Sequence, residues 1–258
     1  MTGRVGPRWT MLGALAGVLN ANFALEWLLP GQGDVGRSVV SDLGLASHPW
    51  SWVFRLGDAL GAVLLLVIGL ALLQSVRRSL TWRVAARRVA GRRVAAGRVA
   101  GRRVRAWRVG AWLVTGFAAA TRVAALVPLS CAATPDSTSA GSPPGASPPL
   151  ANLLHDGVSI AGTTAGIAAA GVLALATRRW QSLAHWLAFA LAAALGLALV
   201  VGAQGEVAEW FGWVQRAQIL VLSLWFAAVG RSIDCLASED PPPIGGGSSD
   251  ARARARRR

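Results

Sequence analysis

Residues 53–74, VFRLGDALGAVLLLVIGLALLQ, are almost continuously apolar, and the arginine-rich residues 77–108 follow almost directly. A helix of 22 residues rises about 1.5 Å per residue and can cross a hydrocarbon core roughly 30 Å thick. The 12 arginines of residues 77–108 are costly to bring into that core, so the segment stays on one side of the bilayer. Together the two segments predict an integral membrane protein.

Five more apolar stretches of comparable length lie along the chain. We therefore predict an all-α fold, an integral membrane bundle of six transmembrane helices in one domain, residues 1–236. The predicted spans are about 9–29, 53–74, 109–129, 153–176, 183–202 and 213–230. Between and after them we predict a basic Arg-Val repeat loop at 77–108, an external Pro/Ser-rich loop at 132–149 and a disordered tail at 237–258.

Charge is distributed unequally between the segments that join the predicted spans. Of the 26 basic residues, all arginine, 22 fall in the amino terminus, the second and fourth connections and the tail. Eight of the 12 acids fall in or beside the other connections. Because cytoplasmic loops carry the excess of arginine, both termini are predicted to be cytoplasmic. The predicted location is the cell (plasma) membrane, as a multi-pass protein.

The formal net charge is +14, but no aromatic-interleaved pattern of a nucleic-acid-binding fold accompanies it. We predict no nucleic-acid partner. Instead we expect membrane lipids as partners, including anionic lipid at the arginine-rich loop, where each arginine contributes about 1 kcal/mol.

Within the arginine-rich loop the pair Arg-Val recurs every five residues from Arg83 to Arg108. Successive valines rotate by about 140° on a helix and form no apolar stripe, which favours a basic loop or helical extension over a dedicated binding element.

Cysteine and histidine are too few for a metal centre. Cys131 and Cys235 are predicted at opposite ends of the bundle, too far apart for a disulfide. Only His48 and His155 are predicted on the outer side, one nitrogen ligand fewer than the usual catalytic zinc set. We therefore predict neither a metal nor a cofactor.

Several ionisable residues intrude on the outer halves of the predicted spans. Near the middle of a span such a group costs about 2.5–3.5 kcal/mol unless it finds a partner. Arg122 lies seven residues before the end of the third span and is predicted to pair inside the bundle with Glu26 or Asp156. Arg55 and Asp58, three residues apart, are predicted to form a local pair. Pairs of this kind serve either as structural clamps or as the lining of a site.

Glycines spaced four residues apart recur in the predicted spans. The pairs are Gly13 with Gly17, Gly57 with Gly61, and Gly162 with Gly166. This small-xxx-small pattern lets helix backbones approach closely, so we expect the pairs at helix–helix contacts.

Three short motifs resemble a known family. The segment Gly36-Arg37-Ser38-Val39-Val40-Ser41-Asp42-Leu43-Gly44 resembles the Ser-x-Leu-Gly signature of bacterial and archaeal membrane proteins of the domain of unknown function 998 family. Two other places also resemble this family. They are His155-Asp156 at the start of the fourth span, and Gly212 with Gln215-Arg216 at the start of the sixth. The resemblance implies a six-span bundle without assigned activity. It also implies a shared polar set: Arg37, Ser41, Asp42, His155 and Arg216.

Two classes of function remain open. The first is non-enzymatic binding or transport of a lipid or small anionic ligand in a polar pocket on the extracytoplasmic side. Its candidate ligand-binding residues are Glu26, Arg37, Ser41, Asp42, Arg122, His155, Asp156 and Arg216, with arginine forks as donors to carboxylate or phosphate. The alternative is a membrane-embedded hydrolase with His155 as base and Ser41, Ser159 or a carboxylate beside it.

Overall fold

The computed structural model describes residues 7–29, 35–36, 38–45, 47–90, 95–127, 129, 150–202 and 210–238, with the backbone alone over 79–100 and at 179. The elements are α1 (Arg8–Asn20), the 3-10 helices η1 (Asn22–Leu28) and η2 (Val40–Gly44), α2 (Ser51–Ala90), α3 (Ala95–Leu126), α4 (Leu150–Ala176), α5 (Arg179–Gly202) and α6 (Phe211–Ser238). Arg37 and the loop 132–149 lie outside the described residues, as does the predicted tail apart from its first two residues.

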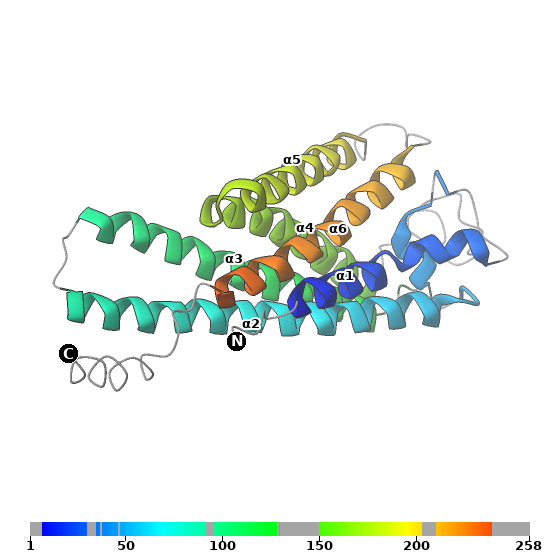
Figure 1. Ribbon diagram of the computed structural model, residues 1–258. Coiled ribbons are helices and arrows are strands. Elements are labelled where there is room, and N and C mark those ends of the chain that lie inside the picture. The colour runs from blue at the N-terminus through cyan, green and yellow to red at the C-terminus, as the bar shows by residue number, and fades with distance from the viewer. Residues whose placement is uncertain are drawn as a thin grey trace, which may run out of the picture.

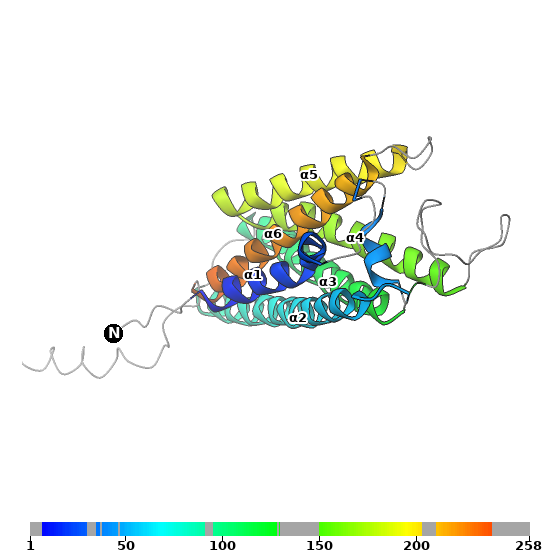
Figure 2. The same ribbon diagram turned by 90° about the vertical axis from the view of Figure 1, so that its right-hand side faces the viewer.

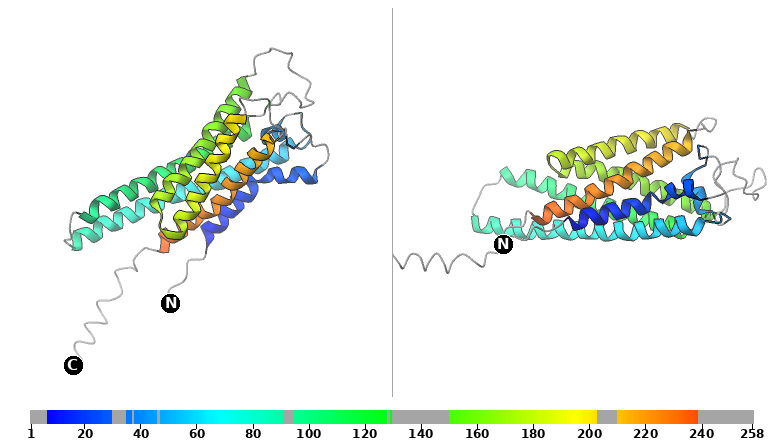
Figure 3. Two further views of the ribbon diagram at one scale, coloured as in Figure 1. Left: turned by 90° about the horizontal axis from the view of Figure 1, so that it is seen from above. Right: turned by 45° about the vertical axis from the view of Figure 1, so that its right-hand side comes forward.

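The six α-helices form a closed bundle in which each helix packs against the next along the chain (Figures 1 and 2). The sixth packs against the first and completes the ring, and α2 also touches α6 across its middle. Successive helices run in opposite directions, so α1 begins and α6 ends at the same end of the bundle (Figure 3). The sequence prediction of an all-helical fold is confirmed for the described residues, which contain no strand.

Among the described residues, five helices are long and apolar enough to cross a membrane: 51–78 within α2, 101–126 within α3, α4, 180–202 within α5, and α6. The pair α1 and η1 makes a sixth when it is counted as one span, but it is bent by 47°. The predicted span over 9–29 thus corresponds to two helical pieces with a bend after Asn20. The bend coincides with Asn22, whose side-chain amide donates to the Phe54 carbonyl of α2 at 2.8 Å.

The basic segment 77–108 is mainly helical, because α2 continues to Ala90 and α3 starts at Ala95. Alanine and arginine, the commonest residues of this segment, are both good helix formers. Of the two forms that the repeat left open, a basic loop or a helical extension, the described backbone has the helical extension. In Figure 1 these ends of α2 and α3 project beyond the other helices.

Large side chains fill the centre of the bundle, with Leu65, Ile68, Leu173 and Phe226 almost completely buried. The outward faces are apolar too: Val18, Leu197 and Leu224 are each about two-thirds exposed or more. A soluble protein rarely exposes so continuous an apolar surface. An apolar interior surrounded by an apolar exterior is the arrangement of helices solvated by lipid chains.

All three predicted glycine pairs lie at helix–helix contacts, as the spacing predicted. A Cβ on Gly13 or Gly17 would clash with the backbone carbonyl of Phe226 or Ser223 on α6. A Cβ on Gly57 would clash with Asn22, and one on Gly61 would crowd Leu19. A Cβ on Gly162 or Gly166 would press against Ala120 or Phe117 of α3.

The start of α1 is held by the far end of α6. The backbone amides of Trp9 and Thr10 donate to the Asp234 carboxylate at 3.2 and 3.0 Å. The first amides of a helix lack partners within the helix, so the carboxylate caps α1. The contact places the first and last described helical turns side by side.

We still expect both ends of the chain on the cytoplasmic side, since the start of α1 and the end of α6 lie at the same end of the bundle as the basic extensions of α2 and α3 (Figures 1 and 3). Reporter fusions after Arg258 and within residues 136–147 should report opposite compartments. A fusion after residue 90 serves as a control and should match the one after Arg258. The same compartment for residue 258 and the 136–147 loop would contradict the six-span topology.

Candidate functional site

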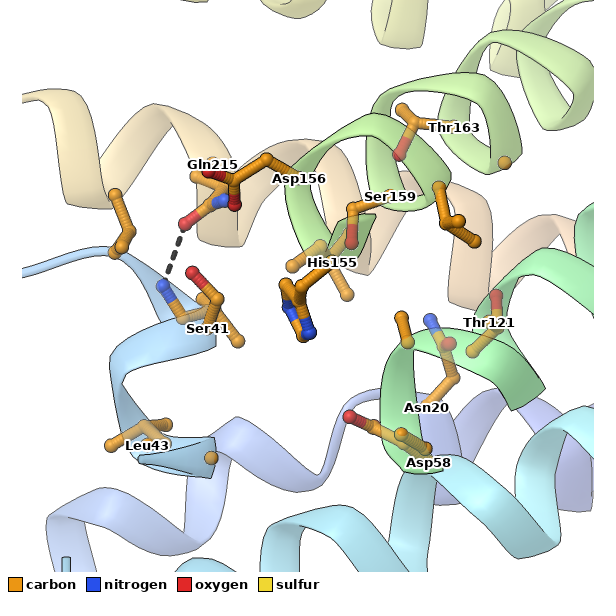
Figure 4. Close-up of a pocket in the computed structure, with 18 of the residues that line it drawn as sticks. Asn20, Ser41, Leu43, Asp58, Thr121, His155, Asp156, Ser159, Thr163 and Gln215 are labelled. Atoms are coloured by element: carbon orange, nitrogen blue, oxygen red, sulfur yellow. Dashed lines mark hydrogen bonds between the residues drawn. The ribbon is translucent and has the colours of Figure 1, made fainter. Parts of the chain in front are cut away.

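A cavity of about 560 Å³ lies at the end of the bundle that the sequence predicts to be extracytoplasmic. Its lining side chains come from α1, η1, η2, α2, α3, α4 and α6 (Figure 4). Twelve of the lining residues are polar: Asn20, Asn22, Ser41, Arg55, Asp58, Thr121, His155, Asp156, Ser159, Thr163, Gln215 and Gln218. A concave space with converging polar groups inside an apolar bundle is the expected form of a ligand site.

One face of α4 supplies the largest share of the polar lining. His155, Ser159 and Thr163 are four residues apart, so they lie on the same face, and Asp156 joins them from the neighbouring position. Thr163 is 13 residues after Leu150, or about 20 Å along the helix. The 27 residues of α4 span about 40 Å. The cavity therefore reaches about halfway along α4.

The ring of His155 has a defined hydrogen-bond partner. Its Nδ1 lies 3.1 Å from the carbonyl oxygen of Val127 at the end of α3. Because a carbonyl can only accept, we assign the proton to Nδ1, which leaves Nε2 as an acceptor. The described residues provide no hydrogen bond from Ser41 or Ser159 to this ring.

Asp58 is held at the cavity wall by a neighbouring amide. Its Oδ1 accepts a hydrogen bond of 3.0 Å from Nδ2 of Asn22. Arg55, the predicted partner of Asp58, instead donates from Nε to the Ala125 carbonyl at 3.0 Å. The predicted local pair is therefore wrong, because the bent first span brings Asn22 to the carboxylate while α3 offers the arginine a carbonyl.

Arg216 and Glu26 form a buried pair beside the cavity, not within its lining. Nε and Nη2 of Arg216 donate to the two carboxylate oxygens of Glu26 at 2.6 and 2.7 Å. Nη1 lies 2.9 Å from the carbonyls of Val35 and Ser38 and 3.1 Å from that of Gly212. The side chains are only 3% and 1% exposed. The guanidinium therefore has no donor left for a ligand.

This pair corrects two predictions from the sequence. Glu26 is the partner of Arg216, not of Arg122. Arg122 is exposed and donates from Nη1 to the Ala59 carbonyl at 3.2 Å. It lies on the surface of α3, contacts neither predicted carboxylate and does not line the cavity. Neither Arg122 nor Arg216 is therefore placed to donate directly to a ligand in this cavity.

The 36–44 segment forms the outer wall of the cavity. The amide of Val40 donates to Oε1 of Gln215 at 2.6 Å, and that of Gly212 donates to the Gly36 carbonyl at 2.6 Å. Asp42 is buried and accepts from the Val39 amide at 3.3 Å, so it stabilises the η2 turn and does not line the cavity. Ser41 does line it. Arg37 lies outside the described residues.

The other outer histidine, His48, stands outside the cavity. Its Nδ1 accepts from the Trp50 amide at 3.3 Å, and burial lowers the pKa of the ring. The part of the chain that the structure describes contains no group of three His, Cys, Asp or Glu side chains able to hold a metal ion.

The structure brings part of the predicted outer polar set to one cavity. Of the eight predicted residues, Ser41, His155 and Asp156 line the cavity, Glu26, Asp42, Arg122 and Arg216 do not, and Arg37 is not described. The prediction did not assign Asp58 or Gln218 to the site. Asp58 had a usable signal, since it is the sixth residue of the predicted span 53–74 and an acid within a span is a site candidate by default.

The fold and this cavity together define the class: the chain is an integral, multi-pass helical membrane protein with a polar cavity at one end. A family model described as "Protein of unknown function (DUF998)" matches residues 88–232. The chain belongs to this family, which confirms the resemblance drawn from the motifs. The match includes His155-Asp156 and Gln215-Arg216 but not the 36–44 segment. No curated protein and no solved structure matches the chain significantly.

Proposed function

We propose that this protein binds the ammonium-bearing, zwitterionic headgroup of a membrane lipid in its outer cavity, without catalysing a reaction. The observation that carries the proposal is a set of polar groups left without protein partners. Ser41, Asp156, Ser159 and Thr163 line the cavity and have no partner among the described residues. Nε2 of His155 adds a free acceptor. Polar groups facing a cavity usually find water or a ligand.

The balance of charge favours a ligand with a positive group. Asp58 and Asp156 line the cavity together with one arginine, Arg55, whose Nε is occupied by a backbone carbonyl. Arg55 is the one arginine of the described lining, because Arg216 is saturated by Glu26 and backbone carbonyls and Arg122 lies elsewhere. The described lining thus contains two carboxyl groups and one guanidinium group. An ammonium group beside Asp156 would form a charge-assisted hydrogen bond.

The exposed position of one lining residue favours a lipid over a small solute. Ile160 lines the cavity and is 68% exposed on the apolar outer face of α4. It lies about 15 Å from the start of that helix, which is deeper than the outer end of a membrane span. An opening at this depth would let a headgroup enter while its chains remain in the bilayer.

The floor of the cavity favours binding over conduction. Phe117 is part of the lining, and its ring packs against Phe226 with centroids 5.6 Å apart. Both phenylalanines are buried in the central core. A ligand in the outer cavity would therefore be held at one side of the bundle in this conformation.

Native mass spectrometry after gentle extraction tests the proposal. Wild-type protein should retain phosphatidylethanolamine in preference to phosphatidylglycerol. Asp156→Asn should weaken retention about tenfold, equivalent to about 1.4 kcal/mol for one charge-assisted hydrogen bond. Ser159→Leu should abolish retention by filling the cavity.

The matched control is Gly157→Leu, which adds the same leucine to the same turn of α4. A Cβ on Gly157 meets nothing within 4 Å, so this variant should keep its lipid. Preferential retention of phosphatidylglycerol, or equal retention in all four proteins, would refute the proposal.

A hydrolase is the second candidate, and the assigned tautomer of His155 favours it. Nε2 is free to act as a base in a cavity that also contains the hydroxyls of Ser41 and Ser159. The mass spectra distinguish the two functions. A binding protein returns intact lipid, whereas a hydrolase returns fatty acid and lysolipid, and His155→Ala removes those products.

A further inference from the structure

A second cavity, of about 250 Å³, lies at the opposite end of the bundle, where the arginine distribution predicts the cytoplasm. It is bounded by α2, α3, α4, α5 and α6 and by the short link between α4 and α5. Two arginines, Arg103 and Arg178, line it together with Trp107, Gln181 and Cys235. This cavity shares no residue with the outer one.

Arg103 fixes the wall that α4 contributes. Its Nε donates to the Ala176 carbonyl and its Nη2 to the Thr177 carbonyl, both at 2.9 Å. These carbonyls close α4, where the last C=O groups of a helix lack helical partners. The arginine therefore satisfies the helix end and offsets its partial negative charge.

Three further side chains of the lining carry unused donors, whereas the hydroxyls of Thr177 and Ser232 donate to carbonyls of their own helices. Arg178 is exposed, and neither it nor Gln181 has a hydrogen-bond or ion-pair partner among the residues described. Trp107 is only 9% exposed, yet its indole N–H also lacks a partner within the described structure. An unpaired buried donor costs about 1–3 kcal/mol. The buried indole N–H of Trp107 therefore indicates that the cavity binds a molecule with a hydrogen-bond acceptor.

The charge of the cavity is positive. Its described lining contains two arginines and neither Asp nor Glu. Asp234, the acid next to Cys235, is engaged instead with the start of α1, where Thr10 donates from Oγ1 at 2.7 Å. Gln181 lies in the first turn of α5, where unpaired helix amides add further positive potential.

We propose that this cavity binds a phosphate group through Arg178, Gln181 and the indole N–H of Trp107. A phosphate offers several acceptor oxygens and a negative charge, which match a lining made of donors with a net positive charge. The volume is below the roughly 300–1,000 Å³ of sites for drug-sized ligands, so it suits a headgroup or a small ion. Two sources share this chemistry: an anionic phospholipid of the adjoining leaflet and a soluble phosphate.

Cys235 provides a direct reporter because it lines the cavity as a free thiol. The test uses the full chain with Cys131→Ser, in nanodiscs, and measures the rate of maleimide labelling. Phosphatidylglycerol should slow the labelling of Cys235 about fivefold relative to pure phosphatidylcholine, which corresponds to about 1 kcal/mol. A third arm adds inorganic phosphate to the phosphatidylcholine nanodiscs.

Two variants separate the cavity from general surface charge. Arg178→Ala should remove the protection, and Trp107→Phe should reduce it by removing only the N–H donor. Arg105→Ala removes the same charge from an exposed position of α3 that does not line the cavity, so protection should remain. Arg178 has no described partner, so its variant is expected to fold normally.

Each outcome decides the proposal. Protection by phosphatidylglycerol alone identifies a lipid headgroup, and equal protection by inorganic phosphate identifies a soluble phosphate; both support the site. Unchanged labelling in every arm overturns it. Equal loss of protection in Arg105→Ala and Arg178→Ala also overturns it, because the effect would then belong to the basic surface.

Discussion

Replacing Arg216 with methionine is expected to lower the free energy of unfolding by about 3–5 kcal/mol, the usual result of removing one partner from a buried ion pair. The guanidinium binds both oxygens of Glu26 and three backbone carbonyls, and both side chains are almost fully buried. Methionine would leave the carboxylate without a counter-charge. Thermal unfolding in detergent measures the loss.

Two further variants show whether the pair is responsible. Arg122→Met removes an arginine that is exposed and makes a single hydrogen bond of 3.2 Å, so it should cost no more than about 1 kcal/mol. The double variant Glu26→Gln/Arg216→Met should recover part of the loss, because no charge is then left buried. Strictly additive losses would contradict the pairing.

Gly17→Val is expected to destabilise the protein by about 3 kcal/mol or more. The added Cβ would overlap the Ser223 carbonyl of α6, and a backbone atom cannot be relieved by a change of rotamer. The helices α1 and α6 would have to separate. The same unfolding measurement reports the effect.

Gly116→Val is the matched control, because a Cβ on Gly116 meets nothing within 4 Å and the residue is exposed on α3. This change should alter stability by no more than about 0.5 kcal/mol. Equal losses at the two positions would show that glycine is not needed for the contact between α1 and α6.

The apolar lengths in the sequence predict the helices of the fold, since length and hydropathy are local properties. They do not predict the bend after Asn20. No proline marks it, and Asn22 there bonds across to α2. Which side chain of a neighbouring helix will meet a polar residue is a tertiary property. The helical extensions into the basic segment were open to prediction from the alanine and arginine content.

In the candidate site, too, the sequence predicts local properties but not contacts between helices. The polar positions at the outer ends of the spans are visible in the sequence, and His155, Asp156 and Ser41 indeed line one cavity. Their pairing is not visible, because it depends on which helices are neighbours. Because α1 packs against α6, Glu26 at the end of the first span lies beside Arg216 of α6 and not beside Arg122 of α3.

Because α2 continues as a helix past its membrane span, the arginines at the tip of the basic segment 77–108 lie away from the membrane surface, where their electrostatic effect on lipid is weak. Residues 79–90 add about 18 Å beyond the apolar segment 51–78. At physiological ionic strength a charge is screened over about 8 Å, so the tip lies about two screening lengths from the end of the span. The charges of arginines at the tip are therefore almost completely screened from the lipid headgroups. If the segment attaches to the bilayer electrostatically, as the sequence predicts, the attachment rests on the arginines closest to the bundle.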